Sequence, residues 1–585
     1  MGCGASKASN NDVADDNNNK QQQEEQAQQK DEAAAAPAPA GGRKVQRTAR
    51  KDIGARRAKA ADERQYKLDG PTLTSDDGWQ QEAVIEGGLL LKLTNDDAQA
   101  FYNDSADFEM HIDFAFGPDS DITTLGDTER GTDAADNWIT AKLVVYPNET
   151  KEFIRGAPNG MRGKYNPEAL SAEYLAKMKE AAAAKIAEEQ AAVAALGIEG
   201  KSDAEVLELC AAKGVRFVDP SFPPCRASLQ REGIDQEPIA DSAWRRPTEF
   251  LPEKERNTIT LINGAEPDDI DQGAIGDCWF LCSVASLAEF PEKVHDVFTH
   301  PVSEAAKKKE NDLGGYRVTF MKHGWWRMVV VDDYFPVAAA GLPRFSKNVQ
   351  DRSELWVAIL EKAYAKIHGS YSAIVGGDPL FAMQDLSGYP ITRFDTEWKE
   401  ALESREGSNK LFAQMERYDK AGYMLSLSTP GEDTASYNAS ASNEAGMEDR
   451  YKKAGLALGH AYSVLTVKSF PDKDVNLVRI RNPWGNATEW TGAWSDDDAK
   501  WKEHGDIAKA CEFEAASDGT FWMEWADVKD FFDGGGCCFT CFDWHDYRIK
   551  SALSGGKSSL VLEITVEKDL EAFIIVSQED MRGRP

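Results

Sequence analysis

The stretch DQGAIGDCWFLCSVASLAEF, residues 271–290, carries the strongest local signal in this sequence. Small and flexible residues lead into Asp277 and Cys278, and an apolar run with helical spacing follows them. This pattern places Cys278 at or near the first turn of a helix, where unpaired backbone N–H groups and the helix dipole favour an anion. The sequence therefore predicts a stabilised thiolate at Cys278.

A nucleophilic cysteine needs a base, and the base needs a group that orients it. Two later segments supply these residue types. In LGHAYSVLTV, His460 opens a predicted strand, and in VRIRNPWGNATEW, Asn482 follows another. The chain order Cys, His, Asn is thus compatible with nucleophilic catalysis by a thiolate and an imidazole.

Residues from about 204 to 550 resemble the protease core of the calpains, which are calcium-dependent, papain-like cysteine peptidases. The blocks QGAIGDCW, GHAYSV and IRNPWG occur in that order. Intervening runs are also similar to the family: GVRFVDPSFPP (214–224), WRRPTE (244–249), VVVDD (329–333) and LWVAILEKAYAKIHGSY (355–371). The resemblance implies an α+β fold with a two-lobed papain-like core, lobe 1 at 204–391 and lobe 2 at 392–552.

The resemblance also implies a role for each site residue. Cys278 is the nucleophile, His460 is its general base and later acid, and Asn482 orients the imidazole. Gln272 donates to the oxyanion beside the backbone N–H of Cys278, and Trp484 covers the His–Asn pair. The family mechanism implies that Ca²⁺ rotates the two lobes until the thiolate and the imidazole come within hydrogen-bond reach.

No EF-hand loop occurs in the sequence, but the resemblance implies one Ca²⁺ in each lobe. The first-lobe ligands would be the carboxylates of Asp269 and Glu354 and the backbone carbonyls of Ile262 and Gly264. The second-lobe ligands would be the carboxylates of Glu489, Asp496 and Asp518 and the carbonyl of Ala516. Thr520 stands where the family has a fourth carboxylate, and the loop 485–489 is one residue longer. We therefore expect weaker binding in lobe 2.

Other cysteines offer alternatives to this interpretation. Cys282 shares a helix face with Cys278, and we expect a small buried hydrophobe rather than a second nucleophile. A second group resembles half of a zinc site: Cys537, Cys538, Cys541 and His545. Since no second C-x-x-C accompanies it and the region is typical of a strand, metal binding there is not favoured.

The chain begins MGCGASK, in which Gly2 and Ser6 satisfy the N-myristoylation pattern and Cys3 is a palmitoylation candidate. Residues 43–59 contain eight Lys or Arg and one Asp. Because one acyl chain binds membranes only marginally, a second chain or a basic cluster is needed for stable attachment. The sequence predicts a disordered, acylated and polybasic tail over 1–65 that binds the inner leaflet.

Residues 66–165 are expected to form a small β-rich domain that contains no catalytic constellation. Strict alternation over Phe108–Phe116 predicts a half-buried strand, with further strands at 89–93 and 138–146. Residues 166–203 are expected to connect it to the core through a helix over 167–196; binding of a partner by this helix is the alternative. Residues 553–585 resemble the start of a calpain-type β-sandwich, with strands at 560–567 and 571–576, and we expect it to be truncated.

The length and the amino-acid composition exclude several classes of protein and of partner. The 585 residues include 67 Lys+Arg against 99 Asp+Glu, for a net charge of −32, and 41% are hydrophobic. At about 150 residues per domain this length predicts roughly four units. There is no uninterrupted apolar run of membrane-spanning length, nine cysteines are few for so long a chain, and the negative charge disfavours nucleic acid as a partner.

These observations predict a calcium-dependent cysteine endopeptidase that performs limited proteolysis at the membrane or the cytoskeleton. The layout is similar to kinetoplastid-type calpain-related proteins. No secretory leader is recognised, so we expect a cytoplasmic protein at the inner face of the plasma membrane, with protein substrates and cytoskeletal partners. Two alternatives stay open: an inactive calpain-like scaffold, and a transglutaminase-like acyl transferase, which the contexts of Gln272 and Asn482 fit less well.

Overall fold

The computed structural model describes residues 66–298, 303–338, 341–431, 446–485, 489–542, 544–558, 560–579 and 582. The expected acylation residues Gly2 and Cys3 and the basic cluster 43–59 lie outside these ranges. No helix within the ranges combines the length and the apolar character needed to cross a bilayer.

The first body of the fold is a β-sandwich of two antiparallel sheets. One sheet has the order β1 (Gln80–Ala83), β2 (Leu90–Asn95), β3 (Ala98–Asn103), β8 (Thr150–Ala157) and β5 (Asp121–Thr124). The other has the order β6 (Glu129–Thr132), β7 (Ile139–Val145), β4 (Phe108–Phe116) and β9 (Met161–Ala169). Two short 3₁₀ turns, η2 (Ser75–Asp77) and η3 (Glu86–Gly88), flank β1.

The strand predicted over Phe108–Phe116 is confirmed as β4, whose residues Met110, Ile112 and Phe116 are buried between the sheets. The helix predicted over 167–196 begins later than expected. β9 continues to Ala169, and α3 covers Ala172–Ala194. The physical reason is the ladder along β4, in which every residue of β9 has a partner, and this pairing outweighs the helix propensity of the segment.

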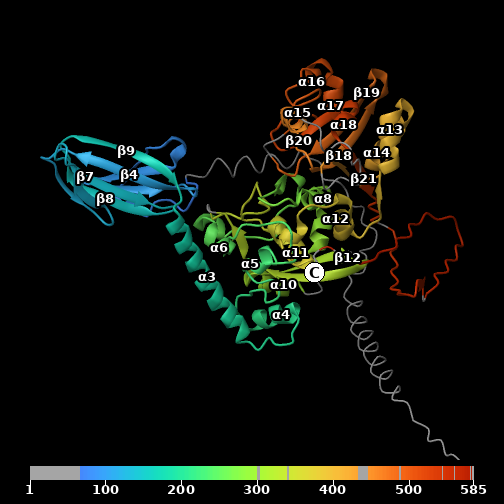
Figure 1. Cartoon of the computed structure of the whole chain (residues 1–585), viewed down its shortest axis with the longest axis horizontal. Helices are drawn as coiled ribbons and strands as arrows, with labels where there is room; N and C mark the ends of the chain where they lie inside the picture. The colour runs from blue at the N-terminus through green and yellow to red at the C-terminus, as the bar shows by residue number, and fades with distance from the viewer. Residues whose placement is uncertain are drawn as a thin grey trace, which may run out of the picture.

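Helix α3 joins the sandwich to the remainder of the molecule, and it runs along the outside of the second body (Figure 1). Its Glu189 accepts hydrogen bonds from the fully buried Arg246, which also pairs with Asp333 and lies 4.0 Å from the ring centroid of Tyr334. A surface ion pair, Lys185 with Glu249, lies further along the same face. The sandwich is therefore attached through a helix that is anchored by a buried charge network.

The second body carries Cys278 and is built around two buried helices, α8 (Cys278–Ala288) and α11 (Trp356–His368). Its other helices are α4 (Asp203–Lys213), α5 (Arg226–Leu229), α6 (Pro247–Phe250), α7 (Glu253–Arg256), η4 (Pro267–Asp269), α9 (Pro291–Val297), α10 (Glu304–Asp312), η5 (Ser372–Ile374) and α12 (Pro379–Ser387). Its strands are β10 (Ala243–Arg245), β11 (Ile270–Asp271), β12 (Gly315–Lys322), β13 (Trp325–Asp332), β14 (Phe335–Val337) and β15 (Lys347–Asn348).

The third body carries His460 and Asn482 on a six-stranded sheet of order β16-β21-β17-β18-β19-β20. These strands are β16 (Ile391–Arg393), β21 (Gly534–Cys538), β17 (Met424–Ser428), β18 (Ala461–Phe470), β19 (Val475–Arg481) and β20 (Thr520–Glu524). The helices of this body are α13 (Asp395–Glu403), α14 (Arg405–Lys420), α15 (Met447–Ala454), η6 (Pro471–Lys473), α16 (Lys500–Glu503), α17 (Gly505–Ala510) and α18 (Trp525–Phe531). Side chains alternate along β19, so that Val478 and Leu477 enter two different apolar clusters.

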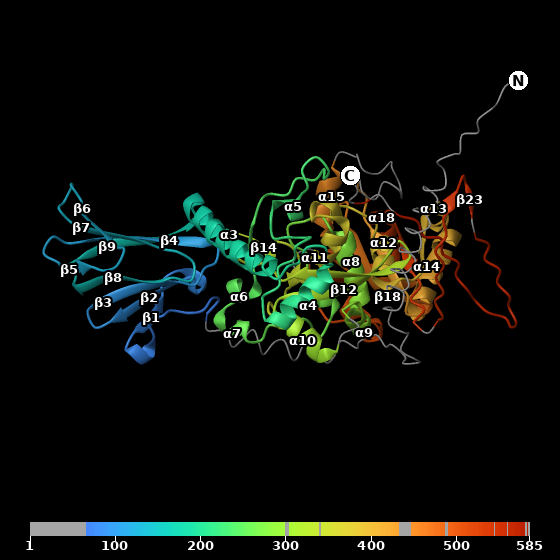
Figure 2. The ribbon, with the colours of Figure 1, turned by 90° about the horizontal axis from the view of Figure 1, so that it is seen from below.

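The second and third bodies contact each other along one side of α8, as both views show (Figures 1 and 2). The hydroxyl of Ser463 on β18 donates to the carbonyl of Cys282 on α8 at 3.1 Å. Near the catalytic candidates, the backbone N–H of Gln272 donates to the carbonyl of Pro483 at 3.2 Å. Arg481, fully buried, lies 3.4 Å from the carboxylate of Asp268. The expected nucleophile and the expected base thus lie in bodies that are joined by direct hydrogen bonds.

The expected β-sandwich strands at 560–567 and 571–576 are not formed. The only strands in the described residues after 550 are the short pair β22 (Leu553–Ser554) and β23 (Lys557–Ser558). Val561 and Val576 are 94% and 92% exposed. A strand needs a neighbouring backbone and a covered face, and the described residues supply neither for this segment.

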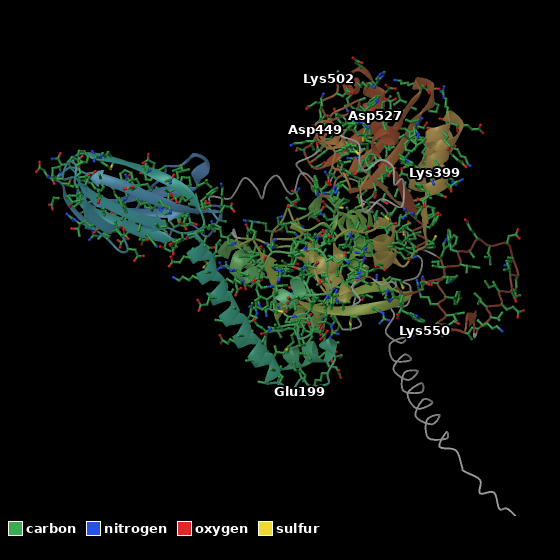
Figure 3. The ribbon with its side chains drawn as sticks, viewed as in Figure 1. Glu199, Lys399, Asp449, Lys502, Asp527 and Lys550 are labelled. Carbon is green, nitrogen blue, oxygen red and sulfur yellow. The ribbon has the colours of Figure 1, made fainter. Side chains whose placement is uncertain are left out.

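Charged side chains cover the outside of all three bodies, consistent with the net charge of −32 (Figure 3). In that view Lys399, Asp449, Lys502 and Asp527 project from the body that carries His460. Glu199 lies at the turn between α3 and α4. Acidic and basic side chains are therefore both found on the outside of the body that carries His460.

Candidate active site

Helix α8 begins at Cys278, with Asp277 at its N-cap. Every later residue of the helix is buried, whereas Cys278 itself is partly exposed. A Cβ on Gly273 would lie 2.3 Å from the backbone of Phe345, so the loop that leads into the helix can pack this tightly only with glycine there. The structure thus presents the Cys278 thiol at a helix N-terminus, where a thiolate is favoured.

His460 and Asn482 meet at adjacent ends of β18 and β19. His460 Nε2 lies 2.8 Å from Asn482 Oδ1, and both side chains are buried. The ring centroid of Trp484 lies 4.4 Å from that of His460, and the backbone N–H of Trp484 donates to Asn482 Oδ1 at 3.0 Å. The structure therefore brings together the three residues assigned to this part of the site, with the aromatic ring against the imidazole.

The amide oxygen of Asn482 only accepts, so the short contact assigns the imidazole proton to Nε2. Nδ1 is then the nitrogen that can take a proton. Burial lowers the pKa of His460 to about 4, while the bond to Asn482 raises it by a smaller amount. The imidazole is therefore neutral at physiological pH, as a general base must be.

Tyr462 connects this pair with the cysteine side of the site. Its ring lies edge-on to His460, with centroids 4.8 Å apart. Burial raises the pKa of Tyr462, and the charge of the Cys278 thiolate raises it further. The phenol beside His460 therefore stays neutral.

Gln272 is hydrogen-bonded differently from what the resemblance implies. Its Nε2 donates to the carbonyl of Ile275 at 2.6 Å, and its buried Oε1 has no hydrogen-bond partner. One N–H of the amide expected to face an oxyanion therefore bonds within its own loop, and the second N–H is left to serve a substrate.

The first expected calcium site is assembled from loops around α11. Glu354 Oε1 accepts from the N–H of Asn263 at 2.6 Å, between the expected carbonyl ligands of Ile262 and Gly264. Asp269 is buried, and its carbonyl accepts from the N–H of Val349 at 2.9 Å. The carboxylates and carbonyls of this set are hard oxygen donors of the kind that Ca²⁺ selects.

The second expected site gathers three acids near one loop. Burial raises the pKa of Glu489, and the charges of Asp496 and Asp518 raise it further. The backbone N–H of Ala516 donates to the carboxylate of Asp496 at 2.9 Å, and the backbone N–H of Thr520 donates to the carboxylate of Asp518 at 2.8 Å. The mutual repulsion of these carboxylates is a charge excess that a cation would relieve. Among the described residues, however, no three His, Cys, Asp or Glu side chains are grouped closely enough to form a metal cluster.

The other cysteines were considered above as a second nucleophile and as part of a zinc site, and their surroundings in the structure bear on both roles. Cys282 is fully buried, as expected for a small hydrophobe, and burial raises its pKa. Cys537, Cys538 and Cys541 are also buried, and burial raises the pKa of Cys538 to about 12. Burial also raises the pKa of Cys537, and within the described ranges no three His, Cys, Asp or Glu side chains are grouped as a metal site.

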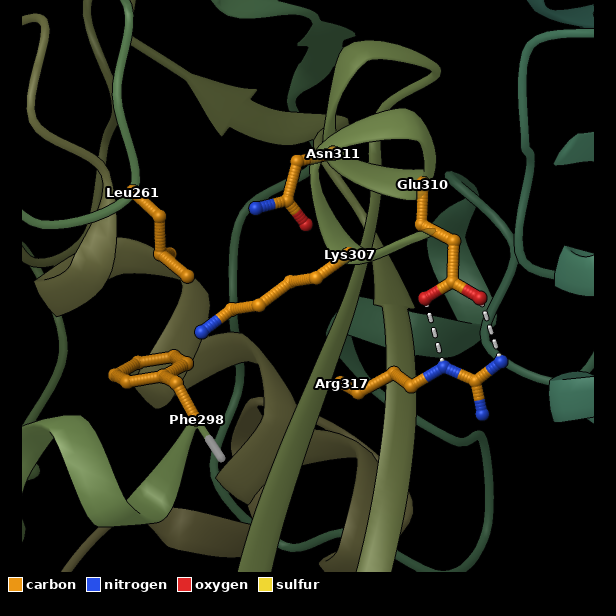
Figure 4. Close-up of a pocket in the computed structure, with 6 residues that line it drawn as sticks. All are labelled: Leu261, Phe298, Lys307, Glu310, Asn311 and Arg317. Atoms are coloured by element: carbon orange, nitrogen blue, oxygen red, sulfur yellow. Dashed lines mark hydrogen bonds and ion pairs between the residues drawn. The ribbon is translucent and has the colours of Figure 1, made fainter. Parts of the chain in front are cut away.

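A cavity of about 10 Å³ is lined by other residues, three of which belong to α10 (Figure 4). Arg317 and Glu310 form a two-point ion pair on one side of it, with Nη2 and Oε1 2.7 Å apart, and Phe298 and Leu261 close the other. This volume is on the scale of a single water molecule. The cavity is a structural packing feature rather than a substrate site.

One buried pair escaped the sequence reasoning altogether. Asp277, next to the expected nucleophile, and Glu361 on α11 are both buried and lie in hydrogen-bond contact. Glu361 itself could have indicated the pair in the sequence, because it is a single acid that follows the apolar run WVAIL in a helix whose residues are almost all buried.

Residues 217–539 match the family described as calpain family cysteine protease, and residues 66–170 match a domain of unknown function, DUF1935. The calpain-type cysteine protease ADL1 of Oryza sativa subsp. japonica is 35% identical over 332 residues, which are 56% of this chain and 14% of that protein. Calpain-9 of Homo sapiens is 34% identical over 338 residues, 57% of this chain and 44% of that protein.

An NMR structure of SMP-1 (Small Myristoylated Protein) from Leishmania major is 32% identical, covers 20% of this chain and 92% of its own, and has a TM-score of 0.18. The chain thus spans less than half the length of both curated relatives named here. The family match itself covers more than half of the chain, and the protein therefore belongs to the calpain family of cysteine proteases.

Proposed function

We propose that the protein is a calcium-dependent cysteine endopeptidase that cleaves peptide bonds with Cys278, His460 and Asn482. The observation that carries this proposal is the 2.8 Å contact between His460 Nε2 and Asn482 Oδ1, packed against Trp484. This contact leaves Nδ1 of a neutral imidazole to accept the thiol proton, and the thiol lies at the start of a buried helix.

The chemistry follows from these positions. The Cys278 thiol gives its proton to His460 Nδ1, and the sulfur attacks the peptide carbonyl carbon. As the C–N bond breaks, the imidazolium returns this proton to the leaving amine, and a thioester remains on sulfur. A water molecule then gives a proton to His460 and attacks the thioester. The carboxylic acid leaves, and the thiol is restored.

The Cys278→Ser variant tests the proposal, because a serine hydroxyl is far less acidic than a thiol, and burial makes His460 too weak a base to deprotonate it. We expect the wild-type chain to cleave casein in the presence of Ca²⁺ and Cys278→Ser to show no measurable cleavage. Gel electrophoresis of the casein measures the cleavage. Cys225→Ser, at an exposed cysteine outside the site, is the matched control. Equal cleavage by the wild type and Cys278→Ser would contradict the proposal.

Ca²⁺ would be held in the first site by Asp269 and Glu354 with the carbonyls of Ile262 and Gly264. In the second it would be held by Glu489, Asp496 and Asp518 with the carbonyl of Ala516. Bound there, Ca²⁺ would offset the negative charge of these carboxylates. Support for this assignment comes from the oxygen donors beside Asn263 and from the charge excess at Glu489.

Glu354→Gln is expected to weaken Ca²⁺ binding about tenfold, since affinity is tuned by ligand charge. The glutamine keeps an oxygen that can accept from the Asn263 N–H, so the loop retains its bond. Isothermal titration calorimetry with Ca²⁺ measures the effect on the full chain. Glu403→Gln, at an exposed acid of α13, is the control. Unchanged affinity in Glu354→Gln would exclude the carboxylate as a ligand.

We propose further that the chain acts in the cytoplasm at the inner face of the membrane, through Gly2, Cys3 and the basic cluster 43–59, on protein substrates that include cytoskeletal proteins. The sequence motif alone supports this step.

Gly2→Ala keeps an α-amine but removes the glycine that the N-myristoylation motif requires at position 2. It should therefore move most of the protein from the membrane fraction to the soluble fraction of eukaryotic cells. Gly4→Ala is the matched control and should stay with the membrane. Persistence of Gly2→Ala on membranes would contradict an acyl anchor.

The second candidate function is a calpain-like scaffold without proteolytic activity. The specific observation in its favour is the hydrogen bond of Gln272 Nε2 to Ile275, which occupies one of the two N–H groups of the expected oxyanion donor. A scaffold of this kind would bind its partners equally well with Ser at position 278, and neither form would cleave casein at millimolar Ca²⁺.

A further inference from the structure

Two carboxyl groups share one buried site, and one of them belongs to the residue that immediately precedes the nucleophile. Asp277 is 0% exposed at the N-cap of α8, and Glu361 is 1% exposed on α11. Their side chains are in hydrogen-bond contact. Two ionised carboxylates both accept and neither donates, so this contact is a hydrogen bond only if one of them carries a proton.

The surroundings decide which group carries the proton. Both carboxylate oxygens of Glu361 accept from the N–H of Ser346, at 3.0 and 3.2 Å. The buried oxygens of Asp277 receive no such donor, and its side chain does not cap α8. Burial raises the pKa of Glu361 to about 7, and burial together with the charge of Glu361 raises that of Asp277 well above its ordinary value. The proton therefore belongs to Asp277, and the charge to Glu361.

The other charged and titratable groups that face this pair are engaged elsewhere. Lys347 lowers the pKa of Glu361 but is paired with Asp271 at 2.7 Å. The buried Tyr371 stays neutral, because burial and the nearby acids raise its pKa. Asp332, which also acts on Tyr371, is paired with the buried Lys362. No counter-ion for an ionised Asp277 is thus provided by these groups.

Asp277 is coupled to the nucleophile through the backbone as well. Its carbonyl accepts from the N–H groups of Phe280 and Leu281 at 2.9 and 3.1 Å, which forms the first turn of α8. The same residue therefore fixes the direction of the Cys278 N–H. A negative charge on its side chain would oppose a thiolate at the next residue, since like charges disfavour each other.

We propose that Asp277 and Glu361 form an acid pair that shares one proton and positions Cys278: the proton is kept on Asp277, so that the negative charge stays on Glu361, away from the nucleophile. The pair touches neither substrate nor the reacting atoms, and it acts through α8. The inference rests on the proposed function, in which Cys278 is the nucleophile, and it adds residues to which no catalytic role has been given above.

Charge relocation tests this inference. Asp277→Asn retains a donor toward Glu361, and it mimics the protonated acid. Glu361→Gln can still accept from Ser346 while its amide donates to Asp277, so that the charge moves onto Asp277. The rate of Cys278 alkylation by iodoacetamide is measured against pH, resolved by peptide mass spectrometry, with the exposed Cys225 in the same samples as the internal control.

We expect Asp277→Asn to keep the apparent pKa of the Cys278 thiol, and Glu361→Gln to raise it by about one unit. The double variant Asp277→Asn/Glu361→Gln, which carries no charge in the pair, should return it to the wild-type value or below. Equal shifts of the apparent Cys278 pKa in both single variants, or no shift of this pKa in Glu361→Gln, would overturn the proposal.

A merely structural role would lower the melting temperature without moving the Cys278 profile. Because alkylation needs no substrate, a chain that never cleaves casein still reports the outcome. Failure of the acid pair is therefore distinguishable from failure of the proposed protease.

Discussion

Replacing His460 by Ala is expected to lower kcat for casein cleavage about 10³-fold. The imidazole is the only base that the described site places beside Asn482, and its loss removes the acceptor for the thiol proton. It also removes the imidazolium that protonates the leaving amine. KM should change far less, since His460 is buried and lies beneath Trp484 rather than on an open surface.

His545→Ala is the matched control for this variant, because His545 is exposed and belongs to the cysteine group that resembles half of a zinc site. We expect its kcat to equal that of the wild type. A fall of similar size in both variants would assign the loss at His460 to folding, and full activity of His460→Ala would refute its role as the base.

Arg246→Ala is expected to lower the free energy of unfolding by about 3 to 5 kcal/mol. Arg246 is fully buried and binds Glu189 of α3, the Phe217 carbonyl and the nearly buried Asp333. Its removal leaves the nearly buried Asp333 with only the longer contact to Arg216, at 3.8 Å. Urea denaturation followed by tryptophan fluorescence measures the change.

Lys185→Ala provides the comparison, since Lys185 pairs with Glu249 on the same face of α3 but at the surface, with 45% of its side chain exposed. A surface pair of this kind is worth less than about 1 kcal/mol. Equal losses in the two variants would show that the buried network contributes no more than an ordinary surface contact.

The sequence predicted elements well wherever one strong periodic pattern decided them. Alternation over Phe108–Phe116 predicted β4, and the apolar run after Cys278 predicted a helix that starts there. It failed where long-range pairing competes with local propensity. β9 extends to Ala169 because β4 offers it a complete ladder, and the apolar run at 560–576 forms no strand because no strand of the described residues lies beside it.

The candidate site was predictable to the level of residue types and order, but its hydrogen bonds were not. No pattern could show that Gln272 donates to Ile275, or that a proton is required between Asp277 and Glu361. The first depends on the conformation of one loop, and the second on the meeting of Asp277 with Glu361, 84 residues apart in the sequence. The same holds for Glu354, whose carboxylate reaches the loop at Asn263 only in the folded chain.

The most direct test of the account is labelling of the full chain by an electrophilic peptide probe for cysteine peptidases, with and without millimolar Ca²⁺. The labelled cysteine is identified by mass spectrometry. We expect labelling of Cys278 that requires Ca²⁺ and is lost in His460→Ala, while the buried Cys282 stays unlabelled. Absence of labelling at Cys278 in the presence of Ca²⁺, or equal labelling with and without it, would contradict the central claim of a calcium-dependent cysteine endopeptidase.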